Sequence, residues 1–91
     1  MDWNNIQAAN GVWTTPATYD GIPRVRKLTI YAPGDLELQV KRDVIHEFSG
    51  SDVDVLTWPA GINSRTFPGG IVGFRLRGKT GVVSGIEVSA Q

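Results

Sequence analysis

Alternation of apolar and polar residues is the feature that most constrains how this chain can fold. Apolar side chains recur at every second position between residues 28 and 40, and again in two runs between residues 70 and 90. A period of two residues is typical of strands that bury one face. Gly, Pro, Asn, Asp and Ser punctuate the chain every 8–12 residues or so, as they do in small sandwiches and barrels. The sequence therefore predicts an all-β fold, either a small antiparallel β-sandwich or a jelly-roll-like barrel, with an irregular N-terminal arm.

The apolar positions of these runs share one parity, so we expect their side chains to form a single core. The predicted members are Leu28, Ile30, Leu36, Leu38, Val40, Phe74, Leu76, Ile86 and Val88. In the last run, Val82–Ala90, the even-numbered positions from Val82 to Ala90 are expected to share one face of the strand.

Two short connections predict hairpins. Ala32–Asp35 reads as a type II turn, in which Pro33 presets φ at the second position and Gly34 takes positive φ at the third. The second hairpin joins strands at Gly70–Arg77 and Val82–Ala90 through the glycine-bounded turn Gly78–Gly81.

Weaker patterns fill the middle of the chain. Val44–Phe48 and Val53–Trp58 are short strand candidates, and Ile62–Pro68 is expected to cross between strands without regular structure. His46 is the only histidine and is expected to be a cross-strand polar residue. Asp52 and Asp54 lack the further oxygen ligands of a calcium loop, so we expect them to be solvated carboxylates.

The chain divides into an N-terminal arm or subunit-contact segment, residues 1–23, and a single β-domain, residues 24–91. The arm shows no sustained period but carries Trp3 and Trp13, with a short strand possible at Val12–Thr15. One interpretation is that Trp13 and Tyr19 cap the domain's own core; the other is that the arm docks on a neighbouring subunit, where Trp and Tyr are good anchors. Because ordering each residue costs roughly 1–2 kcal/mol, we expect the arm to be ordered mainly in the assembled state.

Composition narrows the classes of function. The 91 residues suffice for one domain, and nine basic and nine acidic residues give a formal net charge of zero, which argues against a nucleic-acid partner. There is no cysteine and only one histidine, so we expect neither enzymatic activity nor a metal or cofactor. No apolar run is long enough for a membrane span, and the first residues do not begin a secretory signal, so we expect synthesis in the cytoplasm and no membrane partner.

A recurring order of turn motifs covers roughly residues 27–90. The motifs are Ala32-Pro33-Gly34-Asp35-Leu36, Pro59-Ala60-Gly61, Pro68, the basic strand Phe74–Arg77, and Gly78-Lys79-Thr80-Gly81 leading to Ile86. This layout resembles small virion structural proteins of tailed bacteriophages, of the spike-base or head-decoration type. The resemblance implies a non-enzymatic virion subunit that is made in the host cytoplasm. Such a subunit would form a homo-oligomer, of which a trimer is one form, and would also bind other virion proteins.

The aromatic residues leave a second class of function open. As partner contacts of a virion subunit we expect Trp3, Trp13, Tyr19, Tyr31 and Trp58. The alternative is a carbohydrate-binding β-sandwich module in which exposed Trp3, Trp13, Trp58 and Tyr31 stack on sugar rings. Rings that are coplanar and exposed would favour sugar binding, whereas rings buried between chains would favour the structural subunit.

Overall fold

The computed structural model describes residues 2–18, 24–43, 48 and 55–91. All regular structure in these residues is β-strand, which confirms the predicted all-β class. The strands are β1 (Asp2–Ala8), β2 (Thr14–Thr18), β3 (Val25–Ala32), β4 (Leu36–Lys41), β5 (Leu56–Trp58), β6 (Gly61–Ile71), β7 (Gly73–Gly78) and β8 (Val83–Ala90).

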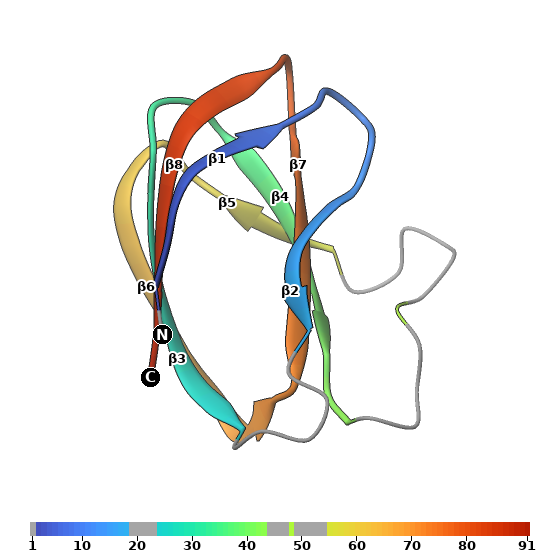
Figure 1. Cartoon of the computed structure of the whole chain (residues 1–91), viewed down its shortest axis with the longest axis vertical. Helices are drawn as coiled ribbons and strands as arrows, with labels where there is room; N and C mark the ends of the chain where they lie inside the picture. The colour runs from blue at the N-terminus through green and yellow to red at the C-terminus, as the bar shows by residue number, and fades with distance from the viewer. Residues whose placement is uncertain (1, 19–23, 44–47, 49–54) are drawn as a thin grey trace.

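The strands form two antiparallel four-stranded sheets that pack face to face (Figure 1). Sheet A has the strand order β1-β8-β3-β6, and sheet B has the order β2-β7-β4-β5. Except for β4 and β5, every pair of strands that is consecutive in the chain is split between the two sheets. This strand order is that of an eight-stranded jelly roll, in which two Greek keys roll into a sandwich.

Both predicted hairpins are wrong, because their connections cross from one sheet to the other. β3 lies in sheet A and β4 in sheet B; likewise β7 lies in sheet B and β8 in sheet A. The connections are therefore arches over the edge of the core. Alternation shows which residues of a strand face the core. It does not show whether the next strand pairs with that strand in the same sheet or packs across the core in the other sheet, because the same alternate positions are buried in both cases.

Gly34 does not take the positive φ that a type II turn requires, so that prediction is also wrong. The structure suggests a different reason for a glycine here. A Cβ placed on Gly34 would lie 3.1 Å from Cγ2 of Val83, so the β3–β4 arch passes closely over β8. A larger residue could adopt the backbone conformation of Gly34, but its side chain would have too little space beside Val83.

A β-bulge in β8 overturns the expected parity at the start of that strand. The pairing of β1 with β8 shifts between Ile6↔Ile86 and Ala8↔Val83, and Gly85 within this interval has φ of 71°. As a result Val83 is buried, whereas Val82 is 59% exposed. The extra residue of a bulge is what allows two apolar residues three positions apart to face the same core.

The predicted irregular crossing at Ile62–Pro68 is in fact part of the longest strand, β6. β6 pairs only with β3 and forms one edge of sheet A. Edge strands tolerate proline because one side of the backbone needs no partner, which explains Pro68. Phe67 is buried, and Gly69 and Gly70 take positive φ where the chain turns toward β7.

The described part of the N-terminal segment forms two strands, so the expectation that this segment is irregular is wrong. β1 pairs with β8 at one edge of sheet A, and β2 pairs with β7 at one edge of sheet B. Both pairings contain register shifts, and Asn5 in β1 has φ of 55°. These interruptions remove the period-2 pattern, so the sequence shows no strand signal although the chain forms strands.

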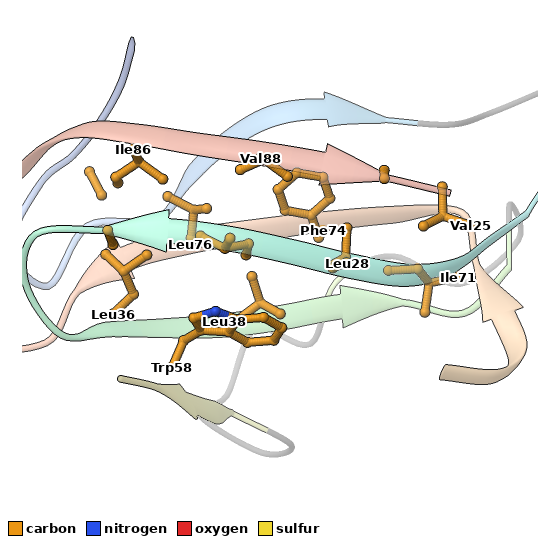
Figure 2. Close-up of a cluster of buried hydrophobic side chains, with 14 of the residues drawn as sticks. Val25, Leu28, Leu36, Leu38, Trp58, Ile71, Phe74, Leu76, Ile86 and Val88 are labelled. Carbon is orange, nitrogen blue, oxygen red and sulfur yellow. The ribbon is translucent and has the colours of Figure 1, made fainter. Parts of the chain in front are cut away.

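The core between the sheets contains all nine predicted residues. Eight of them are buried, and Val40 is partly buried against the others. Figure 2 shows how Leu36, Leu38, Phe74 and Leu76 of sheet B face Leu28, Ile86 and Val88 of sheet A. Further buried residues come from segments with weaker patterns, among them Ala8, Trp58, Phe67 and Ile71.

Candidate functional site

The arches β1–β2, β3–β4, β5–β6 and β7–β8 meet at one end of the sandwich, the upper part of Figure 1. We call this region the arch end and define it as residues 9–13, 33–35, 59–60 and 79–82. Asp35 joins three of the arches: its carbonyl accepts the backbone N–H of Lys79 at 3.1 Å, and its Oδ1 accepts that of Ala60 at 2.9 Å. The remaining arch, β1–β2, is attached to the end of β7, where the N–H of Gly78 donates to the carbonyl of Ala9 at 2.8 Å.

Two of the four exposed large apolar side chains of the described chain lie on the arch end. Val12 is 61% exposed in the β1–β2 arch, and Val82 is 59% exposed in the β7–β8 arch. The two arches are held together by the Gly78–Ala9 bond and by a second bond from the N–H of Gly11 to the carbonyl of Gly78 at 3.4 Å. The backbone therefore holds both valines in place on loops that are hydrogen-bonded to one another.

The outer face of sheet B carries a layer of cations and aromatic rings. The guanidinium carbons of Arg75 and Arg77 lie 4.6 and 4.3 Å from the centroid of Trp13, within the range of a cation–π contact. Arg75 also lies 4.9 Å from the ring of Phe48. A Cβ on Gly73 would be 3.7 Å from Phe48, so this ring also covers the neighbouring backbone.

Side chains of β4 hold the two arginines from the opposite strand. Gln39 is directly across from Arg75 and accepts bonds from its Nε, at 2.8 Å, and from one of its terminal nitrogens. Glu37 is directly across from Arg77 and accepts a bond from its Nε at 3.0 Å, with both side chains mostly buried. Since each guanidinium has a polar acceptor and an aromatic cover, we interpret this layer as structural packing that fastens the β1–β2 arch to sheet B.

The outer face of sheet A, by contrast, is hollowed. A hollow of about 320 Å³ extends across strands β1, β8, β3 and β6. Its residues include the carboxylates of Asp2 and Glu87, the hydroxyl of Ser89 and the exposed ring of Tyr31. Tyr31 is 42% exposed, and the neighbouring Ile62 is 75% exposed. This is the surface of the described chain where an exposed aromatic ring and several polar groups line one depression.

A second hollow, of about 230 Å³, lies where the edges of the two sheets adjoin. Thr57, Trp58 and Pro59 line it from β5 and the following arch, and Asn63, Ser64 and Arg65 line it from β6. Trp58 is 2% exposed, and its indole N–H has no hydrogen-bond partner within the described residues. Such a donor costs about 1–3 kcal/mol when buried. Because Trp58 belongs to the core cluster, its ring serves first to close the sandwich at this edge.

The structure separates the five residues predicted as partner contacts. Trp3 is half-buried and meets Phe74 edge to face at 5.4 Å, whereas Trp13 is half-buried on the arginines of sheet B. Trp58 is in the core, and Tyr31 is the one exposed residue among the four that the structure describes. Tyr19 lies outside the described residues. The tryptophans and Tyr31 therefore do not form one coplanar, exposed platform within a single chain.

Sequence reasoning missed the polar neighbours of Tyr31. Asp2, Thr29, Glu87 and Ser89 come from distant parts of the chain, and their only common signal is that each occupies a polar position between apolar ones or at a chain end. His46, Asp52 and Asp54 lie outside the described residues. In the described ranges no three His, Asp or Glu side chains gather as metal ligands would. Nor does that part of the chain contain a helix that could cross a membrane.

Comparison with known proteins adds no relative to this description: no family model, no curated protein and no solved structure matches the chain.

Proposed function

We propose that this protein is a non-enzymatic structural subunit of a tailed-bacteriophage virion, such as a head-decoration, spike-base or fibre-attachment protein. It acts by assembling with copies of itself and with other virion proteins. The observation that carries the proposal is the construction of the arch end. The motifs on which the phage resemblance rests, at Ala32–Leu36, Pro59–Gly61 and Gly78–Gly81, are far apart in sequence and are joined there by the bonds of Asp35.

The same region offers a surface suited to assembly. Val12 and Val82 are exposed on loops that hydrogen bonds hold in place, so little conformational freedom is lost when a partner covers them. The formal net charge is zero, so long-range repulsion between copies is weak. A rigid apolar surface on a neutral domain is what a subunit needs in order to associate through its loops.

The test is the native mass of the purified protein, measured by native mass spectrometry and by light scattering after gel filtration. We expect an oligomer, and we expect Val12→Asp combined with Val82→Asp to shift it to monomer, because a buried unpaired carboxylate is unfavourable. Thr66→Asp, on the exposed edge strand β6, is the matched control and should leave the oligomer intact. Equal far-UV circular dichroism spectra would show that all variants fold.

The virion assignment needs its own measurement. Antibodies raised against the chain should label particles purified from a lysate of the phage that encodes it, and should label a fixed position on each particle. A chain that is monomeric at all concentrations, or that is absent from washed particles, would contradict the proposal.

The carbohydrate alternative, in its original form, required Trp3, Trp13, Trp58 and Tyr31 to act as one platform. The burial of Trp58 and the packing of Trp3 and Trp13 do not favour that arrangement. We therefore do not propose a tryptophan platform as the basis of function.

A further inference from the structure

Most of the residues that line the hollow on the outer face of sheet A belong to two adjacent rows of side chains that run across the strands, and Asn4 and Val88 complete the lining. The first row contains only short or acidic side chains: Asp2 is opposite Ser89, and Ser89 is opposite Thr29. The row continues beyond the hollow to Ser64, which is opposite Thr29. The second row is larger: Glu87 is opposite Tyr31, and Tyr31 is opposite Ile62. A row of short side chains beside a row of long ones produces the depression.

The side chains of the short row are polar, and a hydrogen bond holds two of them in place. The hydroxyls of Thr29 and Ser64 are hydrogen-bonded to each other at 2.8 Å, which fixes their rotamers. Ser89 is the next residue in the same row, and the Asp2 carboxylate ends it. Such a row presents several hydrogen-bonding oxygens at the spacing of adjacent strands, roughly 5 Å apart.

The long row supplies an apolar wall. Tyr31 and Ile62 are the only exposed large apolar residues on this face in the described chain, and they are direct cross-strand neighbours. Glu87 borders Tyr31 on the other side. An aromatic ring beside hydroxyls and carboxylates can contact the C–H face of a sugar ring while the polar groups bind the sugar hydroxyls, the general arrangement of a small-molecule site with few placed polar groups.

The charges around the hollow limit the chemical class of ligand that it can bind. Its lining contains two carboxylates, Asp2 and Glu87, and no Lys or Arg. Lys27 is on the next row of the face, opposite Thr66, and does not line the hollow. An anionic ligand such as a phosphate or a uronic acid would meet like charge here, whereas a neutral polyhydroxylated ligand would find acceptors for its hydroxyl protons.

We propose that this hollow is a binding site for neutral carbohydrate. The pyranose ring stacks on Tyr31 next to Ile62, and its hydroxyls donate to Asp2 and Glu87 and exchange bonds with Ser89. The site is a function additional to assembly and lies on a different surface from the arch end. The two proposals can therefore fail independently.

The experiment is a titration of ¹⁵N-labelled full-length protein with methyl glucoside, methyl galactoside, N-acetylglucosamine and the trisaccharides of glucose and N-acetylglucosamine, followed by amide chemical shifts. We expect at least one of these neutral sugars to bind and to shift amides of Asp2, Thr29, Tyr31 and Ser89. Glucuronic acid is the charged comparison, and we expect it to bind more weakly than the neutral sugars.

Variants then assign the binding to the hollow. Tyr31→Ala should weaken binding about tenfold by removing the stacking ring, whereas Tyr31→Phe should retain it within about threefold. Val82→Ala removes part of another exposed apolar side chain, on the arch end, and should leave sugar binding unchanged. The amide spectra of the variants show whether each remains folded.

The titrations and the variants can overturn the proposal through three results. They are the absence of shifts with every neutral sugar, shifts that map away from sheet A, and unchanged affinity in a folded Tyr31→Ala. Loss of self-association in Tyr31→Ala without any sugar binding would also overturn it, since the face would then be a contact between copies. The native mass of the Val12→Asp and Val82→Asp variant tests the assembly proposal separately.

Discussion

The contact between Trp3 and Phe74 gives a direct test of whether the N-terminal strand belongs to the folded single chain. Trp3 comes from β1 in sheet A and Phe74 from β7 in sheet B, and their rings meet at 5.4 Å with an angle of 76° between planes. Phe74 is fully buried, so Phe74→Ala should cost about 3–5 kcal/mol. At roughly 0.05–0.15 kcal/mol per residue, a chain of this length has a stability of about 5–14 kcal/mol, so that loss approaches the entire stability at the lower end of the range.

A milder pair of substitutions therefore measures the contact better. We expect Trp3→Leu and Phe74→Leu each to lower the free energy of unfolding by about 1–2 kcal/mol, because each leaves an apolar side chain in place but removes the ring and some volume. The edge-to-face contact is lost in either single variant, so the double variant should fall short of the sum by about 0.5–1.5 kcal/mol. Urea unfolding followed by far-UV circular dichroism supplies all four free energies.

Leu36→Val is the control partner, because Figure 2 places Leu36 toward the other end of the core from Phe74. Its cycle with Trp3→Leu should be additive within about 0.3–0.5 kcal/mol. If the cycle of Trp3 with Phe74 is equally additive, or if Trp3→Leu does not change stability, β1 is not packed on the core of the single chain. The original expectation, that the segment orders mainly on a neighbour, would then be favoured.

Three further predictions concern single positions, each measured by the urea midpoint. Gly85→Ala should destabilise the protein by about 1–2 kcal/mol because φ at Gly85 is 71°. The control Gly81→Ala, at a position with equally open space and no positive φ, should change stability by less than about 0.5 kcal/mol. Equal effects of the two substitutions would contradict the bulge at Gly85. Asp35→Ala should cost about 1 kcal/mol by freeing the N–H of Ala60, with Asp35→Asn closer to the parent, and an unchanged midpoint would show that the arches do not need this bond. Trp13→Ala should cost about 1–2 kcal/mol by uncovering the arginines of sheet B, and a neutral result would contradict the structural interpretation of that layer.

Most of the core could be predicted from sequence because, in strands that keep a regular period of two, burial follows parity. Leu28, Ile30, Leu36 and Leu38 occupy alternate positions, and any fold that buries one face of their strands buries all of them. The partner of each strand could not be predicted in the same way. The connection Pro33–Asp35 is short enough for a hairpin and is used as an arch, and local turn chemistry does not distinguish the two when the next strand buries the same parity.

β6 and β1 were missed for a related reason. Both are edge strands of sheet A, and edge strands tolerate residues that a central strand excludes. Pro68 in β6 and Asn5 at positive φ in β1 are examples. In such strands the sequence shows only an isolated buried residue within a polar run, such as Phe67 in β6. This pattern is too weak to predict a strand unless it is already known that β3 needs a pairing partner.

The rows around Tyr31 follow from topology, and the sequence does contain the information that determines how β8 contributes to them. Val83 and Ile86 are three positions apart, an odd spacing that an ideal strand would place on opposite faces, and Gly85 lies between them. An isolated glycine within a strand pattern indicates a bulge, and a bulge reconciles that spacing with one core. Glu87 and Ser89 face outward because they alternate with the buried Ile86 and Val88, and the bulge turns Val83 inward. The strand order β1-β8-β3-β6 then aligns Ser89 with Asp2 and Thr29, and Glu87 with Tyr31. The candidate sugar site therefore depends on the jelly-roll strand order, which brings together residues from both ends of the chain.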